Sequence, residues 1–353
     1  MVTTQHVRKG MPASVVKSAA ALGMALAFLP ISVSAQSESA AYQPAEWEKI
    51  VAAAKKEGRV VVYYTPVTPV ILRLKADFEA AFPGIVLEHS RAISGTVAKI
   101  EAERKLGADG GDAHLDSSSI TWTRELAKSG ALKPPAGPES RRWPAAHLLD
   151  GVVLVLGMEP ITIAYNTNLV KTPINGYPDL LRAEFKGKIA TTEILSPTSV
   201  AWYEWLEKTQ GADFLQKLAD LSPRYFTGVA PSTQAAVSGE MTVAAYSIPT
   251  TALPLIAQGA PIRMVLPNPS FGIRYTGAVF AWAKRPNAAL VFLDYLMSPR
   301  GQATWHGKGE TASPLLNIPG ALDSRTVHAY DPAPYTPEVV KAYTAKWNAM
   351  FKR

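Results

Sequence analysis

The feature that most constrains the fold is an alternation of strand-like and helix-like segments between Arg59 and about Gly130. The run "RVVVYY" (59–64) is β-branched and aromatic throughout, which is typical of a buried strand. The segment "VILRLKADFEAAFPG" (70–84) repeats apolar residues at helical spacing. The alternation continues through "IVLEHS", "SGTVAKIEAERKLG", "DAHLDSS" and "TWTRELAKSG". Each connection is long enough for a parallel crossover, so the sequence predicts an open, mostly parallel α/β sheet flanked by helices.

A second α/β alternation runs from about Lys171 to Ala260. Two lobes joined by more than one chain crossing are therefore expected, with a ligand cleft between them. The predicted division is a signal peptide (1–35), a lead-in with the first helix (36–58), mainly lobe 1 (59–165), mainly lobe 2 (166–270), and a return to lobe 1 with C-terminal helices (271–353).

The N-terminus has the three parts of a secretory signal. A basic leader, "MVTTQHVRKGMPASVVK", precedes the apolar stretch "SAAALGMALAFLPISVSA", and Val33 and Ala35 supply the small residues that signal peptidase requires. We expect cleavage after Ala35 and a periplasmic mature protein; an uncleaved membrane anchor is the alternative. The sequence contains no cysteine, which excludes disulfides, thiolate catalysis and thiolate-bound metals.

Other chemistries have little support in the sequence. The net charge is +7, but the basic residues are scattered, so no nucleic-acid surface is expected. The HExxH, GxxxxGK[ST] and GxSxG motifs do not occur, and the six histidines are isolated. We therefore expect no enzyme activity, no cofactor and no metal site. A secreted Ser-His-Asp hydrolase is a weaker hypothesis, because these residue types occur but no motif positions them.

Candidate ligand-binding residues follow from strand ends, where ligands of open α/β sheets bind. Three hydroxyl-rich turns each open a helix, whose free N–H groups suit an anion; helix capping is the alternative reading. Arginines near these loops would add bidentate donors, and tyrosines would stack or donate hydroxyls, although surface or core roles also fit. The full set is Tyr64, Thr65, Arg91, Ser94, Gly95, Thr96, Ser117, Ser118, Tyr165, Ser196, Thr198, Ser199, Tyr246, Ser247, Arg274 and Tyr275.

Several stretches together resemble one family. They are "RVVVYYTPVTPVILRLKADFEAAFPGI", "SGTVAKIEAERKLG", "ITIAYNTNLV", "DLLRAEFKGKIA", "STQAAVSGEMTVAAYS", "IAQGAPIRMVLP" and "NAALVFLDYLMSPRGQ". In this order they are similar to extracellular solute-binding proteins of ABC importers, in the branch of the ferric-iron-binding proteins. The resemblance implies a two-lobed class II periplasmic-binding-protein fold that closes by hinge motion. It also implies that a monomeric receptor delivers its solute to an inner-membrane permease.

The sequence departs from the ferric branch after "GE". Ferric-binding relatives usually carry adjacent tyrosines there, whereas this chain reads "AAYSIPTTAL", with Pro249, Thr250 and Thr251 at that place. A small organic anion, such as a carboxylate, phosphonate or phosphate, is therefore the expected solute. The alternative is a ferric site built from Tyr64, Tyr165 and Tyr246, with or without His89.

Overall fold

The structure, a computed structural model, describes residues 44–91, 95–194 and 196–352. The predicted signal peptide, most of the lead-in and the candidate Ser94 lie outside these residues. Within the described ranges, no helix is long and apolar enough to cross a membrane.

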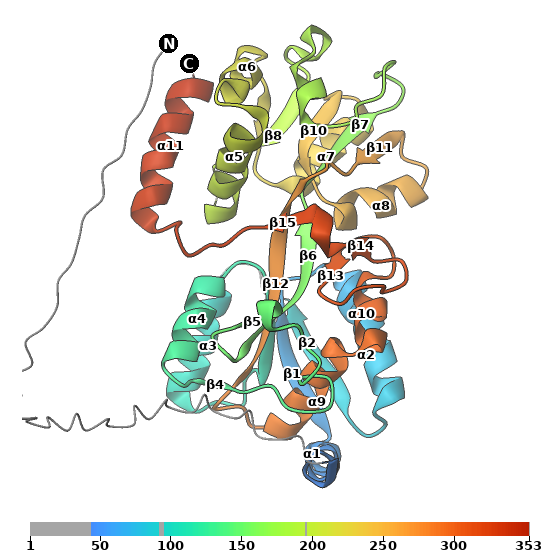
Figure 1. Ribbon diagram of the computed structural model, residues 1–353, viewed down its shortest axis with the longest axis vertical. Helices are drawn as coiled ribbons and strands as arrows, with labels where there is room; N and C mark the ends of the chain where they lie inside the picture. The colour runs from blue at the N-terminus through green and yellow to red at the C-terminus, as the bar shows by residue number, and fades with distance from the viewer. Residues whose placement is uncertain (1–43, 92–94, 195, 353) are drawn as a thin grey trace, which may run out of the picture. The chain divides into compact units, whose positions relative to one another are not determined.

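The first sheet has the strand order β14-β13-β6-β12-β3-β1-β2, with three further short strands paired to β6 or β12 (Figure 1). Its strands are β1 (Arg59–Tyr64), β2 (Val86–Arg91), β3 (Ala113–Asp116), β4 (Leu132–Lys133), β5 (Leu148–Leu149), β6 (Val153–Pro160), β12 (Ser270–Phe280), β13 (Ala312–Ser313), β14 (Leu322–Asp323) and β15 (Val327–Ala329). Strand β1 pairs in parallel with β2 and β3, as the alternation predicts.

The prediction of mostly parallel sheets needs correction, because both sheets are mixed. In the first sheet the long strand β12 runs antiparallel to both β3 and β6. The chain leaves this sheet through β6 and returns through β12. An antiparallel partner needs no crossover helix, so this pair escapes the pattern of alternating strands and helices.

The helices of the first lobe are α1 (Pro44–Glu57), α2 (Thr68–Ala81), α3 (Thr96–Leu106), α4 (Ile120–Lys128), α9 (Pro286–Met297) and α10 (Pro299–His306). In Figure 1, α3 and α4 lie on one side of the sheet and α2, α9 and α10 on the other. The expected apolar face of α2 is confirmed, since Ile71, Leu74 and Phe78 are buried. Helices α9 and α10 follow one another closely but are separate, because Ser298 caps α10 by accepting from the Gly301 amide.

The second sheet has the order β11-β7-β10-β8-β9. Its strands are β7 (Thr162–Asn166), β8 (Ile189–Thr192), β9 (Arg224–Phe226), β10 (Val243–Ser247) and β11 (Ile262–Val265). The surrounding helices are α5 (Pro197–Gln210), α6 (Phe214–Asp220), α7 (Val229–Ser238), α8 (Pro249–Ala257) and α11 (Pro337–Phe351). The described residues of the two lobes also form the short 3₁₀ helices η1 (Ala145–His147), η2 (Tyr177–Leu181), η3 (Ala183–Phe185) and η4 (Ser324–Thr326).

The C-terminal helix α11 packs on the second lobe. Its Trp347 and Phe351 are buried in the core formed around Trp202 and Tyr203. The Tyr225 hydroxyl donates to the Phe351 carbonyl at 2.8 Å. The last part of the chain therefore supplies strands to the first sheet and a helix to the second core.

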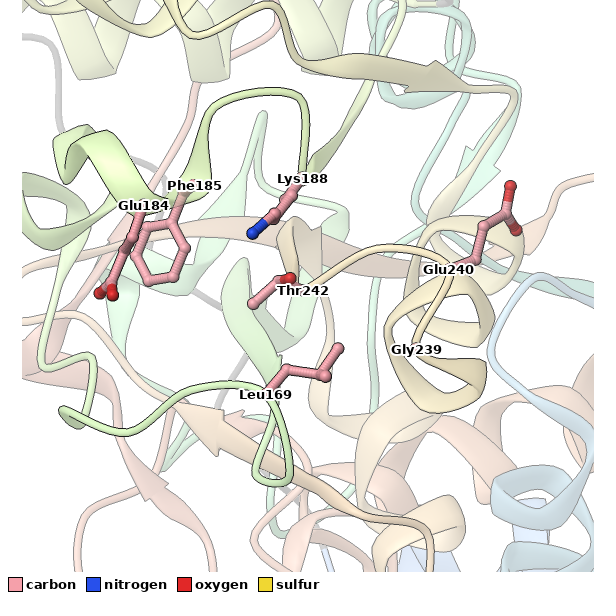
Figure 2. Close-up of a pocket in the computed structure, with 7 residues that line it drawn as sticks. All are labelled: Leu169, Glu184, Phe185, Lys188, Gly239, Glu240 and Thr242. Atoms are coloured by element: carbon pink, nitrogen blue, oxygen red, sulfur yellow. The ribbon is translucent and has the colours of Figure 1, made fainter.

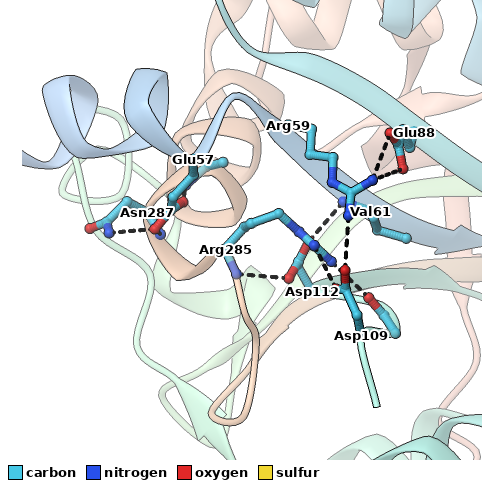
Figure 3. A network of polar contacts seen from close by, with 10 residues as sticks. Glu57, Arg59, Val61, Glu88, Asp109, Asp112, Arg285 and Asn287 are labelled. Carbon is cyan, nitrogen blue, oxygen red and sulfur yellow. Dashed lines mark hydrogen bonds and ion pairs between the residues drawn. The ribbon is translucent and has the colours of Figure 1, made fainter.

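A buried ion pair joins three elements of the first lobe (Figure 3). The Asp112 carboxylate, which is fully buried, accepts from the Val61 amide at 2.8 Å and from the Arg285 Nε at 2.7 Å. Arg285 also pairs with Asp109, which lies 2.9 Å from Arg59 on β1. The network ties β1 and the start of β3 to the residue that precedes α9.

Replacing Asp112 by Asn is expected to cost about 3 kcal/mol of unfolding free energy, because it leaves the buried Arg285 guanidinium without its only fully buried carboxylate partner among the described residues. The measurement is urea unfolding followed by circular dichroism. The matched control is Glu88→Gln, which removes a half-exposed partner of Arg59 and should cost less than about 1 kcal/mol. Equal losses in the two variants would contradict a buried charge pair that stabilises this lobe.

Candidate functional site

The turn after β3 is held by its own carboxylate. Asp116 Oδ2 accepts from the Ser118 amide at 3.1 Å, and from the Ser119 amide at 2.5 Å and hydroxyl at 2.6 Å. Asp116 Oδ1 accepts from the Ser118 hydroxyl at 2.9 Å. The sequence predicted that these donors are free for an anionic solute. In the structure the Ser118 and Ser119 amides, which precede α4, and both hydroxyls donate to a carboxylate that the chain itself provides.

Thr65 and Ser117 lie side by side at the ends of β1 and β3. The Ser117 amide donates to Thr65 Oγ1 at 3.1 Å, and the two hydroxyl oxygens are 3.2 Å apart. Both side chains remain partly exposed. The structure thus brings these two candidates together, as expected for neighbouring parallel strands that end at one sheet edge.

The hydroxyl-rich turn of the second lobe forms a capping box at the start of α5. The Ser196 amide donates to Ser199 Oγ at 3.1 Å, and the Ser199 hydroxyl donates to the Ser196 carbonyl at 2.8 Å. The Thr198 hydroxyl lies 2.9 Å from the Tyr330 hydroxyl. Capping, the alternative that the sequence left open, therefore accounts for much of the hydrogen-bonding capacity of Ser196 and Ser199.

Ser247 and Tyr246 at the end of β10 differ in surroundings. Ser247 is fully buried, and its hydroxyl lies 2.9 Å from that of Thr233 on α7, so this hydroxyl has a partner within the second lobe. Tyr246 packs its ring edge-on to Trp202 at a centroid distance of 4.8 Å. Burial raises the pKa of Tyr246, which keeps its phenol protonated. Tyr165 is also buried in this apolar core.

The candidates near α3 are more open. Gly95 is exposed and adopts a φ of 74°, a left-handed conformation that suits glycine, immediately before α3. Arg91 is exposed, and its Nε donates to the Pro66 carbonyl at 3.2 Å. Tyr64 is buried, with its ring edge-on to His89 at 5.4 Å.

Sequence reasoning missed Glu159, a fully buried carboxyl on β6. Its Oε2 accepts from the Tyr275 hydroxyl at 2.5 Å, and its Oε1 accepts from the Thr250 amide at 3.3 Å and from the Thr250 hydroxyl. Glu159 therefore connects the first sheet to the first turn of α8 in the second lobe. The available signal was an acid inside the apolar run "VVLVLGMEPITIAY". The Tyr275 hydroxyl, predicted to meet a solute, is directed to this carboxyl instead.

Electrostatic interactions show which charged candidates gather near one another. Burial raises the pKa of Tyr275, Glu159 and Asp116 add to this effect, and Arg91 opposes it. Burial also raises the pKa of Tyr330, an effect that Arg274 opposes and Asp116 reinforces. Asp116 thus lies within electrostatic range of both tyrosines, one of which also interacts with Arg91 and the other with Arg274.

Arg274 is partly buried, and its Nη2 donates to the Ala329 carbonyl at 3.2 Å. Burial lowers the pKa of this guanidinium, and the nearby charge of Asp331 partly offsets that effect. Among the residues that the structure describes, neither Arg274 nor Arg91 forms a salt bridge, whereas Arg124 and Arg285 do. An anion placed near Arg274 would stabilise its charged form.

The ferric alternative depends on the first turn of α8. Pro249 and Thr250 occupy this turn, and Thr250 is bonded to Glu159. Over the described part of the chain, no cluster of three or more His, Asp or Glu residues is arranged to hold a metal ion. Pro249 and Thr250 offer no phenolate at the place where the ferric branch usually has its tyrosine pair.

A separate pocket of ≈ 330 Å³ lies where β8 and β10 begin (Figure 2). Figure 2 shows Lys188 extending over this space from the loop before β8, with Thr242 nearby. The lining contains none of the predicted residues. Since β8 and β10 are parallel and ligands of such sheets bind at carboxyl ends, we do not assign the solute to this pocket.

Replacing Glu159 by Gln is expected to flatten the dependence of stability on pH. Burial raises the pKa of Glu159 above its ordinary value of 4.5, so the folded chain holds this proton more tightly than the unfolded chain. The stability contributed by the protonated carboxyl is thus complete below pH 4.5 and is lost as the pH rises through the folded-state value.

The measurement is the melting temperature by calorimetry over a pH series from about 4 to 8, where a native-state proton changes stability. The Glu159→Gln variant should lose part of the decline seen in the parent chain. Glu88→Gln, at a half-exposed carboxylate, should leave the decline unchanged. Parallel profiles for the parent and Glu159→Gln would show that Glu159 does not hold its proton.

Comparisons with known proteins place this geometry in a family. A protein-family model described as bacterial extracellular solute-binding protein matches residues 60–309. A comparison with curated protein sequences found no match.

Among solved structures, the substrate-binding protein of an ABC transporter from Agrobacterium tumefaciens is 16% identical, with a TM-score of 0.70 over 85% of this chain and 97% of that chain. The periplasmic binding protein AfuA from Actinobacillus pleuropneumoniae is 21% identical, with a TM-score of 0.62 over 84% and 99%. HitA from Pseudomonas aeruginosa is 16% identical, with a TM-score of 0.63 over 82% and 99%. These likenesses show the class II periplasmic-binding-protein fold, and the chain belongs to the family of bacterial extracellular solute-binding proteins.

Proposed function

We propose that this chain is the periplasmic receptor of an ABC importer for a small organic anion of carboxylate, phosphonate or phosphate type. Family membership implies a small-molecule solute and an ABC permease as partners. In this proposal the signal peptide is cleaved after Ala35, and the mature monomer binds the solute between its two lobes without chemistry and delivers it to the permease.

The observation that carries the anion class is the environment of Arg274. This guanidinium is partly buried, its pKa is lowered by burial, and a backbone carbonyl is its hydrogen-bond acceptor. A carboxylate or phosphate could take two of its N–H donors at once, which is the geometry that arginine favours. Arg91, exposed beside the turn that opens α3, would add a second positive charge.

The solute class of this chain has to be inferred from its own side chains, because proteins of similar fold are associated with different solutes. AfuA was solved with fructose-6-phosphate bound and HitA with iron bound, while another neighbour, PotD from Streptococcus pneumoniae, is named for spermidine and putrescine. A phosphorylated sugar, a metal and polyamines are thus associated with similar backbones. Arg91 and Arg274, which form no salt bridge among the described residues, fit the first of these classes better than the polyamines, because a cationic solute would be repelled.

The test is thermal-shift and calorimetric screening of the mature protein against carboxylates, phosphonates and phosphate esters. A ligand at 100 times its Kd should stabilise the fold by about 2.7 kcal/mol. Arg274→Gln should weaken binding of that ligand roughly 10- to 100-fold, the usual worth of a hydrogen bond to a charged group. The control is Arg300→Gln, whose guanidinium is exposed and paired with Asp77, and which should bind normally.

Three outcomes would overturn the proposal. The panel produces no shift while ferric iron gives the visible band of tyrosinate-to-iron charge transfer; Arg274→Gln binds the anion as tightly as the parent chain; or the protein turns the ligand over and loses that activity when one serine is replaced.

A further inference from the structure

We propose that a buried water molecule binds between the first turn of α3 and strand β3, held by Thr96 Oγ1 and His114 Nε2. The two atoms belong to residues that line one cavity of ≈ 10 Å³, together with Thr65, Asp116 and Ser119. This volume is about that of one water-sized sphere, the smallest space in which a water can be held.

Both polar atoms lack a hydrogen-bond partner among the described residues, although each is buried. Leaving a buried donor or acceptor unpaired is costly, so native structures pair nearly all such atoms with protein or with ordered water. Two unpaired atoms, carried by residues of separate elements that line the same water-sized cavity, indicate one shared partner. A water can donate to one atom and accept from the other, or donate to both.

The chemistry of His114 fits this role. Its ring is 2% exposed and stacks on Phe280 at a centroid distance of 5.2 Å and an interplanar angle of 13°. Burial lowers the pKa of His114, so the neutral ring is favoured, with one N–H and one acceptor nitrogen. Asp116, at the end of the same strand, is the charge that opposes this effect. The water would pair Nε2 in either tautomer.

The consequence concerns Thr96, which the sequence placed among the solute-binding residues. Its hydroxyl oxygen is buried and belongs to the cavity wall, so Thr96 is a positioning residue. Through the water, it would fix the first turn of α3 against β3. The inference does not depend on which solute the protein binds.

The experiment is a double-mutant cycle on the mature chain, with Thr96→Val and His114→Phe, measured by urea unfolding. A bridging water predicts coupling: the double variant should change the unfolding equilibrium constant at least about threefold less than the product of the two single changes, since contacting sites are not additive. Thr96→Ser, which keeps the hydroxyl, should behave like the parent chain. The control is Thr209→Val, which removes a hydroxyl bonded to the Trp205 carbonyl on α5 and should be additive with His114→Phe.

A crystal structure of the parent protein at high resolution tests for the water directly, whether or not the variants fold. The proposal expects one density peak within about 2.7–3.2 Å of both atoms. A dry cavity, a direct hydrogen bond between Thr96 and His114, or additive effects of the two substitutions would each overturn it.

Discussion

The antiparallel pairing of β6 with β12 connects the two halves of this protein. The register runs from Leu154 opposite Gly277 to Pro160 opposite Gly272, and one further bond joins the Ile161 amide to the Phe271 carbonyl at 2.7 Å. Beyond this bond the chain continues into β7 of the second sheet. Two strands that belong to one sheet therefore also carry the connections to the other, and side chains on them lie where both lobes meet.

Glu159 occupies that meeting point, and its bonds explain several departures from the expected site. Its carboxyl takes donors from β12 and from the first turn of α8, while Asp116 takes the donors at the start of α4. At the turn before α4 an acid of the chain lies where an anionic solute was expected, whereas the start of α8 was not among the predicted turns. In our proposal, side chains and not helix N-termini therefore select the charge of the solute. Arg274 is more buried than Arg91, the other candidate arginine.

The same reasoning explains how similar folds serve different cargo. Helix starts, strand ends and hinge strands are common to the compared structures, whose identities to this chain are 16–21%. A few side chains at these places decide whether the local charge is positive, neutral or negative. In this chain the carboxyl groups of Asp116 and Glu159 already have hydrogen-bond donors from the chain itself. Arg91 and Arg274 are not paired with carboxylates among the described residues, which suits an anion.

The sequence by itself determined the elements with strong local patterns. Periodicity and residue type within short windows predict the strand β1, the apolar face of α2 and the parallel pairing of β2, β1 and β3. The resemblance to solute-binding proteins rested on such segments in order. The candidate site was harder to predict from the sequence. Thr65 and Ser117 lie side by side as predicted, but Ser247 is buried and the hydroxyls of Ser196 and Ser199 cap their own helix.

Tertiary structure alone decided the contacts between residues far apart in the chain. Glu159 lies 91 residues before Thr250 and 116 before Tyr275, and no local pattern relates them. The antiparallel insertion of β12 and the packing of α11 on α5 likewise depend on how distant apolar surfaces are buried together. Sequence periodicity indicates which face of an element is apolar. The element that packs against this face, and the hydrogen-bond partners of the polar groups beside it, are determined only when the chain folds.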